Sequence, residues 1–374
     1  MPTTVQIALI AAVGAAASAA FAGPTPQFYN LGEGAGGTSI SDNGVVAGIH
    51  DGFGQYFYLT AAGGLTLIGG VHPNQGYGGQ ASISNDGMRI AGTNINADTN
   101  LGEAAIYDRN TGSWTNLGGI GGSIDASTSS GWGISGDGNH VVGLGWLPNG
   151  QAHAIRWNQN DGMVDMGSTS PGQASRANAA NGDGSVIGGW QDNDLGRVGA
   201  VWVNGVQRIL TDGDGNPVSE ALSISDDGQW VTGVTYGIPQ TYRYNTFTDT
   251  MEYIDPVDGG FFFPTALGAA ISDDGRTIIG SVRDFGPPIF GTGFIWREGL
   301  GVMSIADFFN YSGVDIDPGM IFSMPFAMSG DGLTFSGLAL SSDFQVVGWV
   351  VTIPAPSSAA ALGLAGLVGL RRRR

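Results

Sequence analysis

Oxygen-bearing side chains offer this sequence its main chance of chemistry, because it has 32 acidic residues and no cysteine. The loop DGDGNPVSE supplies Asp212, Asp214, Asn216 and Glu220, and Ca²⁺ is held by oxygen ligands of this kind. The loop lacks the glycine and the ligand spacing of an EF-hand, so a plain acidic loop is the competing interpretation. Calcium is therefore a candidate cofactor, and the sequence predicts no other.

Aromatic residues beside carboxylates suggest sugar binding. The sequence predicts glycine-rich loops around Trp132 and Trp146, and Trp190 stands just before Asp192 and Asp194. An indole can stack on a sugar ring while neighbouring polar groups hydrogen-bond its hydroxyls. The competing interpretation is that these tryptophans, with residues 261–263 (FFF), fill a channel or cap the packing between repeats. Two carboxylates about 5–10 Å apart could instead hydrolyse a glycosidic bond, but no spacing singles out a pair.

The missing residue types exclude several classes of chemistry. All 14 basic residues are arginine, so the chain has neither a Walker A lysine nor a lysine Schiff base. Without cysteine it has no thiol nucleophile, thiolate zinc site or iron–sulfur cluster. His50, His72, His140 and His153 form no metal-binding pair by spacing. The net charge of −18 argues against nucleic acid as a partner.

One phrase, typified by ISDDGRTIIG, recurs along the chain and indicates the fold. Its turn glycines are Gly44, Gly87, Gly138, Gly184, Gly228, Gly275 and Gly332, each preceded by Asn or Asp. Asn-Gly and Asp-Gly predict a hairpin turn, because both residues tolerate positive φ. Each turn offers at most two carboxylates, so a hairpin is favoured over a calcium loop. In most repeats a second glycine follows four or five residues later, as at Gly143 and Gly280.

Each of the first six repeats supplies four short strands. A third strand ends in an aromatic residue, as in HAIRW and GFIWR, and a fourth follows a short turn. Units of this length predict an all-β fold, a seven-bladed β-propeller, with a β-solenoid as the alternative. The last repeat lacks its fourth strand, and FYNLGEG at residues 28–34 supplies a stray one. We therefore expect residues 28–31 to pair near residues 346–351 and close the ring.

The two ends of the sequence are typical of export signals. Residues 1–22 end an apolar run with Ala-Phe-Ala and predict a signal peptide, and we expect residues 23–353 to form the propeller. Residues 354–374 contain Pro354-Ala355-Pro356, a short apolar run and four arginines. This tail resembles the PEP-CTERM sorting signal, whose usual motif is Pro-Glu-Pro. The resemblance implies transient membrane contact, processing by an exosortase-type enzyme, and a cell-surface or extracellular location.

The repeated phrase resembles the HAF repeat of bacterial extracellular proteins. In that family an AISDDG-like turn, a Val-Val-Gly-like strand and an AFRW-like strand recur. The resemblance supports location and architecture rather than an activity. Two functions remain open: a surface binding or structural module directed at a polysaccharide or another surface component, and an extracellular polysaccharide-active hydrolase or lyase. The variable loops after the second and fourth strands are the expected ligand face.

Overall fold

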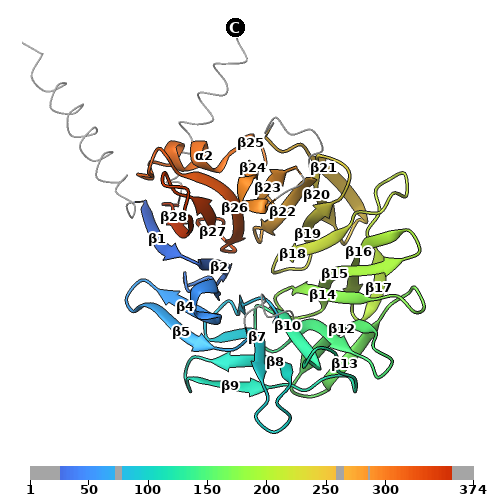
Figure 1. Ribbon diagram of the computed structural model, residues 1–374. Coiled ribbons are helices and arrows are strands. Elements are labelled where there is room, and N and C mark those ends of the chain that lie inside the picture. Colours follow the sequence, from blue (N-terminus) through green and yellow to red (C-terminus); the bar gives the residue numbers. More distant parts are fainter. Residues whose placement is uncertain (1–25, 72–77, 258–264, 285–286, 356–374) are drawn as a thin grey trace, which may run out of the picture.

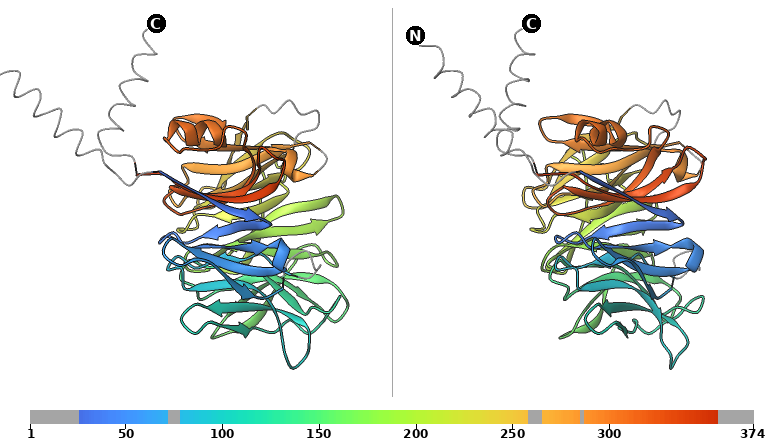
Figure 2. Two further views of the ribbon diagram at one scale, coloured as in Figure 1. Left: turned by 60° about the vertical axis from the view of Figure 1, so that its left-hand side comes forward. Right: turned by 90° about the vertical axis from the view of Figure 1, so that its left-hand side faces the viewer.

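The computed structural model describes residues 26–71, 78–257, 265–284 and 287–355 (Figure 1). Its strands form five four-stranded antiparallel sheets and one eight-stranded sheet. The eight-stranded sheet divides into two four-stranded parts, β18 to β21 and β22 to β25, which are joined where β19 pairs with β22. The resulting four-stranded units surround a common centre like the blades of a propeller (Figure 1). Figure 2 shows the same arrangement of units from the side.

The first strand of each unit lies nearest the centre. These inner strands are β2 (Ala35–Ile40), β6 (Ser82–Ile83), β10 (Ser129–Ile134), β14 (Ser175–Ala180), β18 (Glu220–Ile224), β22 (Thr265–Ile271) and β26 (Ile321–Met328). The second strands are β3 (Val46–His50), β7 (Arg89–Ile95), β11 (Val141–Trp146), β15 (Val186–Asn193), β19 (Trp230–Thr235), β23 (Thr277–Arg283) and β27 (Thr334–Leu340).

The third strands carry the aromatic residues that the sequence placed there. They are β4 (Gln55–Thr60), β8 (Gly102–Asp108), β12 (Ala152–Asn158), β16 (Gly196–Val203), β20 (Thr241–Asn245), β24 (Thr292–Arg297) and β28 (Val346–Thr352). The outer strands are β5 (Gly64–Gly69), β9 (Ser113–Asn116), β13 (Gly162–Gly167), β17 (Val206–Ile209), β21 (Thr250–Ile254), β25 (Gly301–Ser304) and, beside β28, β1 (Gln27–Glu33). Short helices are η1 (Asp51–Phe53), η3 (Pro288–Phe290) and α2 (Ile305–Tyr311).

Strand β1 pairs antiparallel with β28 although the two are far apart in the sequence. Phe28 lies opposite Val351, and Asn30 lies opposite Trp349, which is fully buried. Gln27 lies opposite Thr352, so the described chain enters and leaves the fold at neighbouring points. Because successive strands run in opposite directions, both points lie on the face that carries the Asp-Gly turns. No helix within the described residues is long and apolar enough to cross a membrane.

The Asp-Gly turns differ in backbone conformation from the sequence expectation. Only the glycine takes a positive φ, as at Gly275 (φ 67°), and none of the residues before these glycines does. The Gly275 backbone amide closes the turn by donating a hydrogen bond to the Ser272 carbonyl, and Asp274 contributes through its side chain. The Asp274 carboxylate accepts hydrogen bonds from the Ser272 hydroxyl (2.7 Å) and the Arg276 amide (2.9 Å). Asp is therefore selected as an acceptor that holds the turn together, not for positive φ.

A β-bulge interrupts most inner strands at the same place. In β10 the register slips between Gly131 and Gly133, and in β22 it slips between Gly268 and Ala270. The second glycine of the repeat lies against this bulge. A Cβ added at Gly280 would lie 1.9 Å from the Leu267 carbonyl oxygen, so no side chain fits there. The bulge turns one side chain of each interrupted strand toward the centre of the molecule.

Candidate functional site

A central cavity of about 350 Å³ is surrounded by the inner strands. The bulged residues form one ring of its wall: Thr38, Trp132, Asn178, Leu222, Ala269 and Phe326. Two residues further along each strand lies an apolar belt: Ile40, Ile83, Ile134, Ala180, Ile224, Ile271 and Met328. We call this belt the apolar waist of the cavity.

The end beside the Asp-Gly turns is acidic. In each repeat the second residue before the turn glycine lines the cavity. These seven residues are Asp42, Asn85, Gly136, Gly182, Asp226, Asp273 and Gly330. The Asn85 side-chain amide donates to the Asp226 carboxylate (2.8 Å), and the Asp226 backbone amide donates to the Asp273 carboxylate (3.2 Å). Three carboxylates from three different units thus converge at one mouth of the channel.

Glycine at the other positions of this ring makes room for the carboxylates. A Cβ at Gly182 would lie 2.5 Å from Asp226 Oδ1, and one at Gly330 would lie 2.1 Å from Asp273 Oδ2. The Asp226 and Asp273 side chains therefore extend over the neighbouring turns. The ring is asymmetric because only some units carry a side chain there.

Reduced hydration, together with the crowding of negative charge, raises the pKa of two of these carboxylates, Asp273 and Asp42. Asp273 is exposed at the mouth, yet the surrounding protein reduces its hydration and raises its pKa to about 6. The Asp226 amide opposes this rise, and the charges of Asp226 and Asp42 add to it. The pKa of Asp42 is also raised, first by reduced hydration and then by Asp226 and Asp331. At neutral pH the mouth repels anions.

The opposite end of the cavity carries an arginine stacked on a tryptophan. The Arg176 guanidinium lies 3.8 Å from the Trp132 ring centroid, and both residues line the cavity. Trp190 lies on the next strand, 5.3 Å from Arg176, and Arg197 covers it at 3.6 Å. The order Trp132, Arg176, Trp190, Arg197 forms an alternating stack, which we call the Arg–Trp stack.

Glu220 is the counter-ion of the Arg–Trp stack. It is 6% exposed, and its Oε1 accepts from Arg197 (2.9 Å) and from the Tyr236 hydroxyl (3.2 Å). Its Oε2 lies 3.7 Å from Arg176, beyond hydrogen-bonding distance. Asp192 gives Arg197 a second carboxylate at 3.4 Å. Burial lowers the pKa of Arg176 to about 10, an effect that Glu220 only partly offsets.

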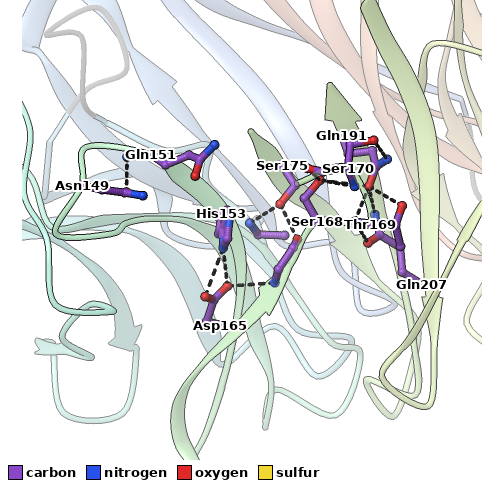
Figure 3. A network of polar contacts seen from close by, with 12 residues as sticks. Asn149, Gln151, His153, Asp165, Ser168, Thr169, Ser170, Ser175, Gln191 and Gln207 are labelled. Atoms are coloured by element: carbon purple, nitrogen blue, oxygen red, sulfur yellow. Dashed lines mark hydrogen bonds and ion pairs between the residues drawn. The ribbon is translucent and has the colours of Figure 1, made fainter. Parts of the chain in front are cut away.

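A polar network fixes the loop that precedes Arg176 (Figure 3). Gln191, which is 2% exposed, accepts hydrogen bonds from the Thr169 amide and from Gln207, and donates to Ser170. Ser175 donates to the Gly167 carbonyl at the start of the same loop. Gln191 and Trp190 are neighbours on β15, so the network connects this loop to the strand that contributes Trp190 to the Arg–Trp stack.

The structure brings only some of the sugar-binding candidates together. Trp132, Trp190 and Asp192 belong to the Arg–Trp stack and its ion pairs, and Trp190 is almost fully buried. Trp146 is half-buried at the end of β11, and Asp194 is exposed beside Gln173; neither lines the cavity. Residues 261–263 and His72 lie outside the described residues.

The four calcium candidates do not share one set of contacts. The Asp212 carboxylate is occupied by the Asp214 amide, by Asn216 and by the Tyr253 hydroxyl, whereas Glu220 faces the arginines. Within the described residues, no three His, Asp or Glu side chains are grouped so as to hold a metal ion. His153 instead pairs with Asp165 at 2.8 Å (Figure 3).

Sequence reasoning missed Arg176, Asp226 and Asp273. The two aspartates sit inside the repeated phrase, where their neighbours Asp227 and Asp274 look equivalent. The residue after Ser in the phrase was the usable signal, because it varies while the rest of the turn is nearly constant. The turn itself does not need a particular side chain there, so that side chain is available for another role. Arg176 has no comparable signal in the sequence.

Comparison with known proteins supports the architecture. No family model matches the chain, and no curated protein matches its sequence. The structure resembles oligogalacturonate lyase from Vibrio parahaemolyticus (12% identity, TM-score 0.54, covering 88% of this chain and 97% of that one). It also resembles the β-propeller domain of the Trilobed protease from Pyrococcus furiosus (11% identity, TM-score 0.53, covering 85% and 95%).

A third similar structure is TolB from Acinetobacter baumannii, at 14% identity and a TM-score of 0.45 over 67% of this chain. The present chain matches 59% of the length of that TolB chain. The likenesses to the lyase and to the protease domain, at 11–12% identity, show the fold alone, and the chain has an all-β, β-propeller fold.

Proposed function

We propose that this chain is an exported binding module that takes part of a polysaccharide into its central cavity. The observation that carries the proposal is the meeting of Trp132, Arg176 and Asn178 in the cavity wall. An indole offers a sugar a stacking surface, and the guanidinium, which Asn178 orients by accepting from its Nε (2.8 Å), offers hydrogen bonds. The waist provides apolar contact for the less polar faces of the sugar rings.

The proposal includes a closed seven-bladed ring. The β1–β28 pairing supports it, because the pairing gives the last unit the fourth strand that its own sequence lacks. It also includes export by residues 1–22 and sorting by residues 354–374 through an exosortase-type enzyme. Strand β28 ends at Thr352, on the face that carries the Asp-Gly turns, and the Arg–Trp stack lies at the opposite end of the cavity. A protein held at the cell surface by its C-terminal tail would therefore present the Arg–Trp stack outward.

The test is a glycan-array screen of the mature domain, followed by titration of each hit against two variants. Trp132→Leu removes the stacking surface in the cavity, whereas Trp146→Leu removes an indole outside it. We expect Trp132→Leu to weaken binding at least about tenfold and Trp146→Leu to leave it within about twofold. Equal losses in both variants, or hits unaffected by Trp132→Leu, would contradict the assignment to the cavity.

A second candidate is a polysaccharide-active hydrolase or lyase. One observation favours it: Asp226 and Asp273 adjoin in the cavity, and the pKa of Asp273 is raised to about 6. A carboxylic acid beside a carboxylate is the pair that glycoside hydrolysis uses. Release of new reducing ends by the wild-type chain, abolished in Asp273→Asn, would favour this candidate over simple binding.

A further inference from the structure

The arginines around Glu220 are unequally compensated. Arg197 contacts two carboxylates, Asp192 and Glu220, and Glu220 gives its short contact to Arg197 rather than to Arg176. Arg176 has only Glu220 Oε2 at 3.7 Å as a charge partner within the described residues. A largely buried cation with one distant counter-ion is poorly stabilised and favours the approach of an anion.

Arg176 also retains unused hydrogen-bond donors. Its Nε donates to Asn178 Oδ1 (2.8 Å), whereas its two terminal amino groups donate to no acceptor within the described part of the protein. Trp132 covers one face of the guanidinium and Trp190 also lies 5.3 Å from it, so the edge is the approach left to a partner. The edge of a guanidinium presents parallel N–H groups that match the two oxygens of a carboxylate.

The other end of the cavity limits how many charges the ligand can carry. Asp42, Asp226 and Asp273 lie at the opposite mouth, in the same ring of residues as Gly182. Gly182 follows Arg176 by six residues, along β14 and into its turn. Six extended residues span about 20 Å. An anionic group near Arg176 is attracted, but a second anionic group deeper in the channel would meet carboxylates.

We propose that the ligand is an acidic sugar chain that carries a single carboxylate at the position bound by Arg176, followed by neutral sugars toward the aspartates. This inference rests on the proposed function and names the ligand class of the same site. The carboxylate meets the edge of Arg176, the attached sugar ring lies along Trp132, and the hydroxyls of the neutral sugars donate to Asp226 and Asp273. A polymer charged at every residue fits less well than one charged sparsely.

The test compares three tetrasaccharides by isothermal titration calorimetry at pH 7.5 and low salt. Aldotetrauronic acid carries one carboxylate, tetragalacturonic acid carries four, and xylotetraose carries none. We expect the singly charged probe to bind at least about tenfold more tightly than xylotetraose and more tightly than the fully charged probe. We expect the advantage over xylotetraose to shrink as salt is raised.

Variants then separate Arg176 from general electrostatics. Arg176→Gln should remove the preference for the charged probe. Arg176→Lys should keep only part of it, because lysine lacks the parallel N–H groups of the guanidinium edge. Arg276→Gln is the matched control, since Arg276 is exposed and pairs with Glu298 outside the cavity. Near-ultraviolet circular dichroism checks that each variant is folded.

The outcomes distinguish the inference from the function on which it rests. Tight binding of xylotetraose, unaffected by Arg176→Gln, would overturn the acidic-sugar inference while leaving a sugar-binding function intact. Preference for tetragalacturonic acid would overturn the single-charge rule. Binding of none of the three probes, in a protein that also binds nothing on a glycan array, would overturn both.

Discussion

The backbone amide of Asp226 donates to the carboxylate of Asp273, its counterpart in the next unit, at 3.2 Å. At five other positions around the same mouth the corresponding amide donates to a backbone carbonyl, as from Gly182 to Asp226 and from Asp273 to Gly330. At this one junction a titratable group therefore replaces a peptide oxygen in the contact between neighbouring units.

This junction predicts a pH-dependent stability. The pKa of Asp273 is raised to about 6 in the folded protein, against about 4 in an unfolded chain. Between these values the folded state holds a proton that the unfolded state loses. The contribution of Asp273 to the free energy of unfolding is therefore full below pH 4 and is lost as the pH rises through 6. Since the side chain is exposed, we expect a loss of only about 1 kcal/mol.

Urea unfolding between pH 4 and 7.5 measures the effect. Asp273→Asn should flatten this part of the profile and stabilise the protein at pH 7.5. Asp315→Asn removes the same charge from a loop outside the cavity and should leave the profile unchanged. If Asp273→Asn keeps the wild-type pH profile, the raised pKa does not govern stability in this range.

The glycine opposite each bulge predicts a position that tolerates no side chain. In Gly280→Ala the new Cβ would lie 1.9 Å from the Leu267 carbonyl oxygen, a backbone atom that cannot move aside without breaking the bulge. We expect a loss of about 3 kcal/mol or more in unfolding free energy, or failure to fold. In Gly213→Ala nothing lies within 4 Å of the new methyl group, so its unfolding free energy should stay near wild type.

The repeated phrase was informative because its constant residues serve the backbone. Glycine in the turn adopts positive φ, and Asp274 binds its own turn, and these needs recur in every unit. Hairpins and aromatic third strands could therefore be predicted from one sequence. The turn conformation itself was misjudged, because Asp-Gly suits both a two-residue turn and a longer turn that ends in a left-handed glycine.

The candidate site was less predictable, since its geometry depends on bulges and on contacts between units. Trp132 faces the cavity only because the bulge in β10 turns it inward. Glu220 looked like a loop carboxylate, yet it begins β18 and binds arginines of the preceding unit. Neither relationship has a fixed spacing in the sequence.

Glu220 predicts a large loss on neutralisation. Glu220→Gln would leave Arg176 and Arg197 close together with less negative charge, and breaking a buried ion pair from one side typically costs about 3–5 kcal/mol. Glu252→Gln breaks the 2.7 Å pair with Arg243, but Glu252 is 53% exposed, so we expect a change of about 1 kcal/mol or less. Chemical denaturation of both variants at one pH compares them. Similar losses in the two would mean that Glu220 is not the central counter-ion of the Arg–Trp stack.

The last prediction concerns the pairing of β1 with β28. A protein that starts at Gly34 lacks the strand whose Phe28 lies opposite Val351 and packs edge-on to Phe322, with ring centroids 6.4 Å apart. Its loss would expose one edge of β28 and part of the cluster around Trp349, so the melting temperature should fall by about 5 °C or more.

A synthetic peptide of residues 27–33 provides the complementary experiment. Added in excess to the shortened protein, it should restore part of the lost melting temperature, because binding to the folded state alone stabilises that state. A peptide in which Phe28 is replaced by Asp should restore less, since its charge would be placed against Phe322. A shortened protein that melts like the full-length one would show that β1 adds nothing to the fold, and the closed ring would have to be abandoned.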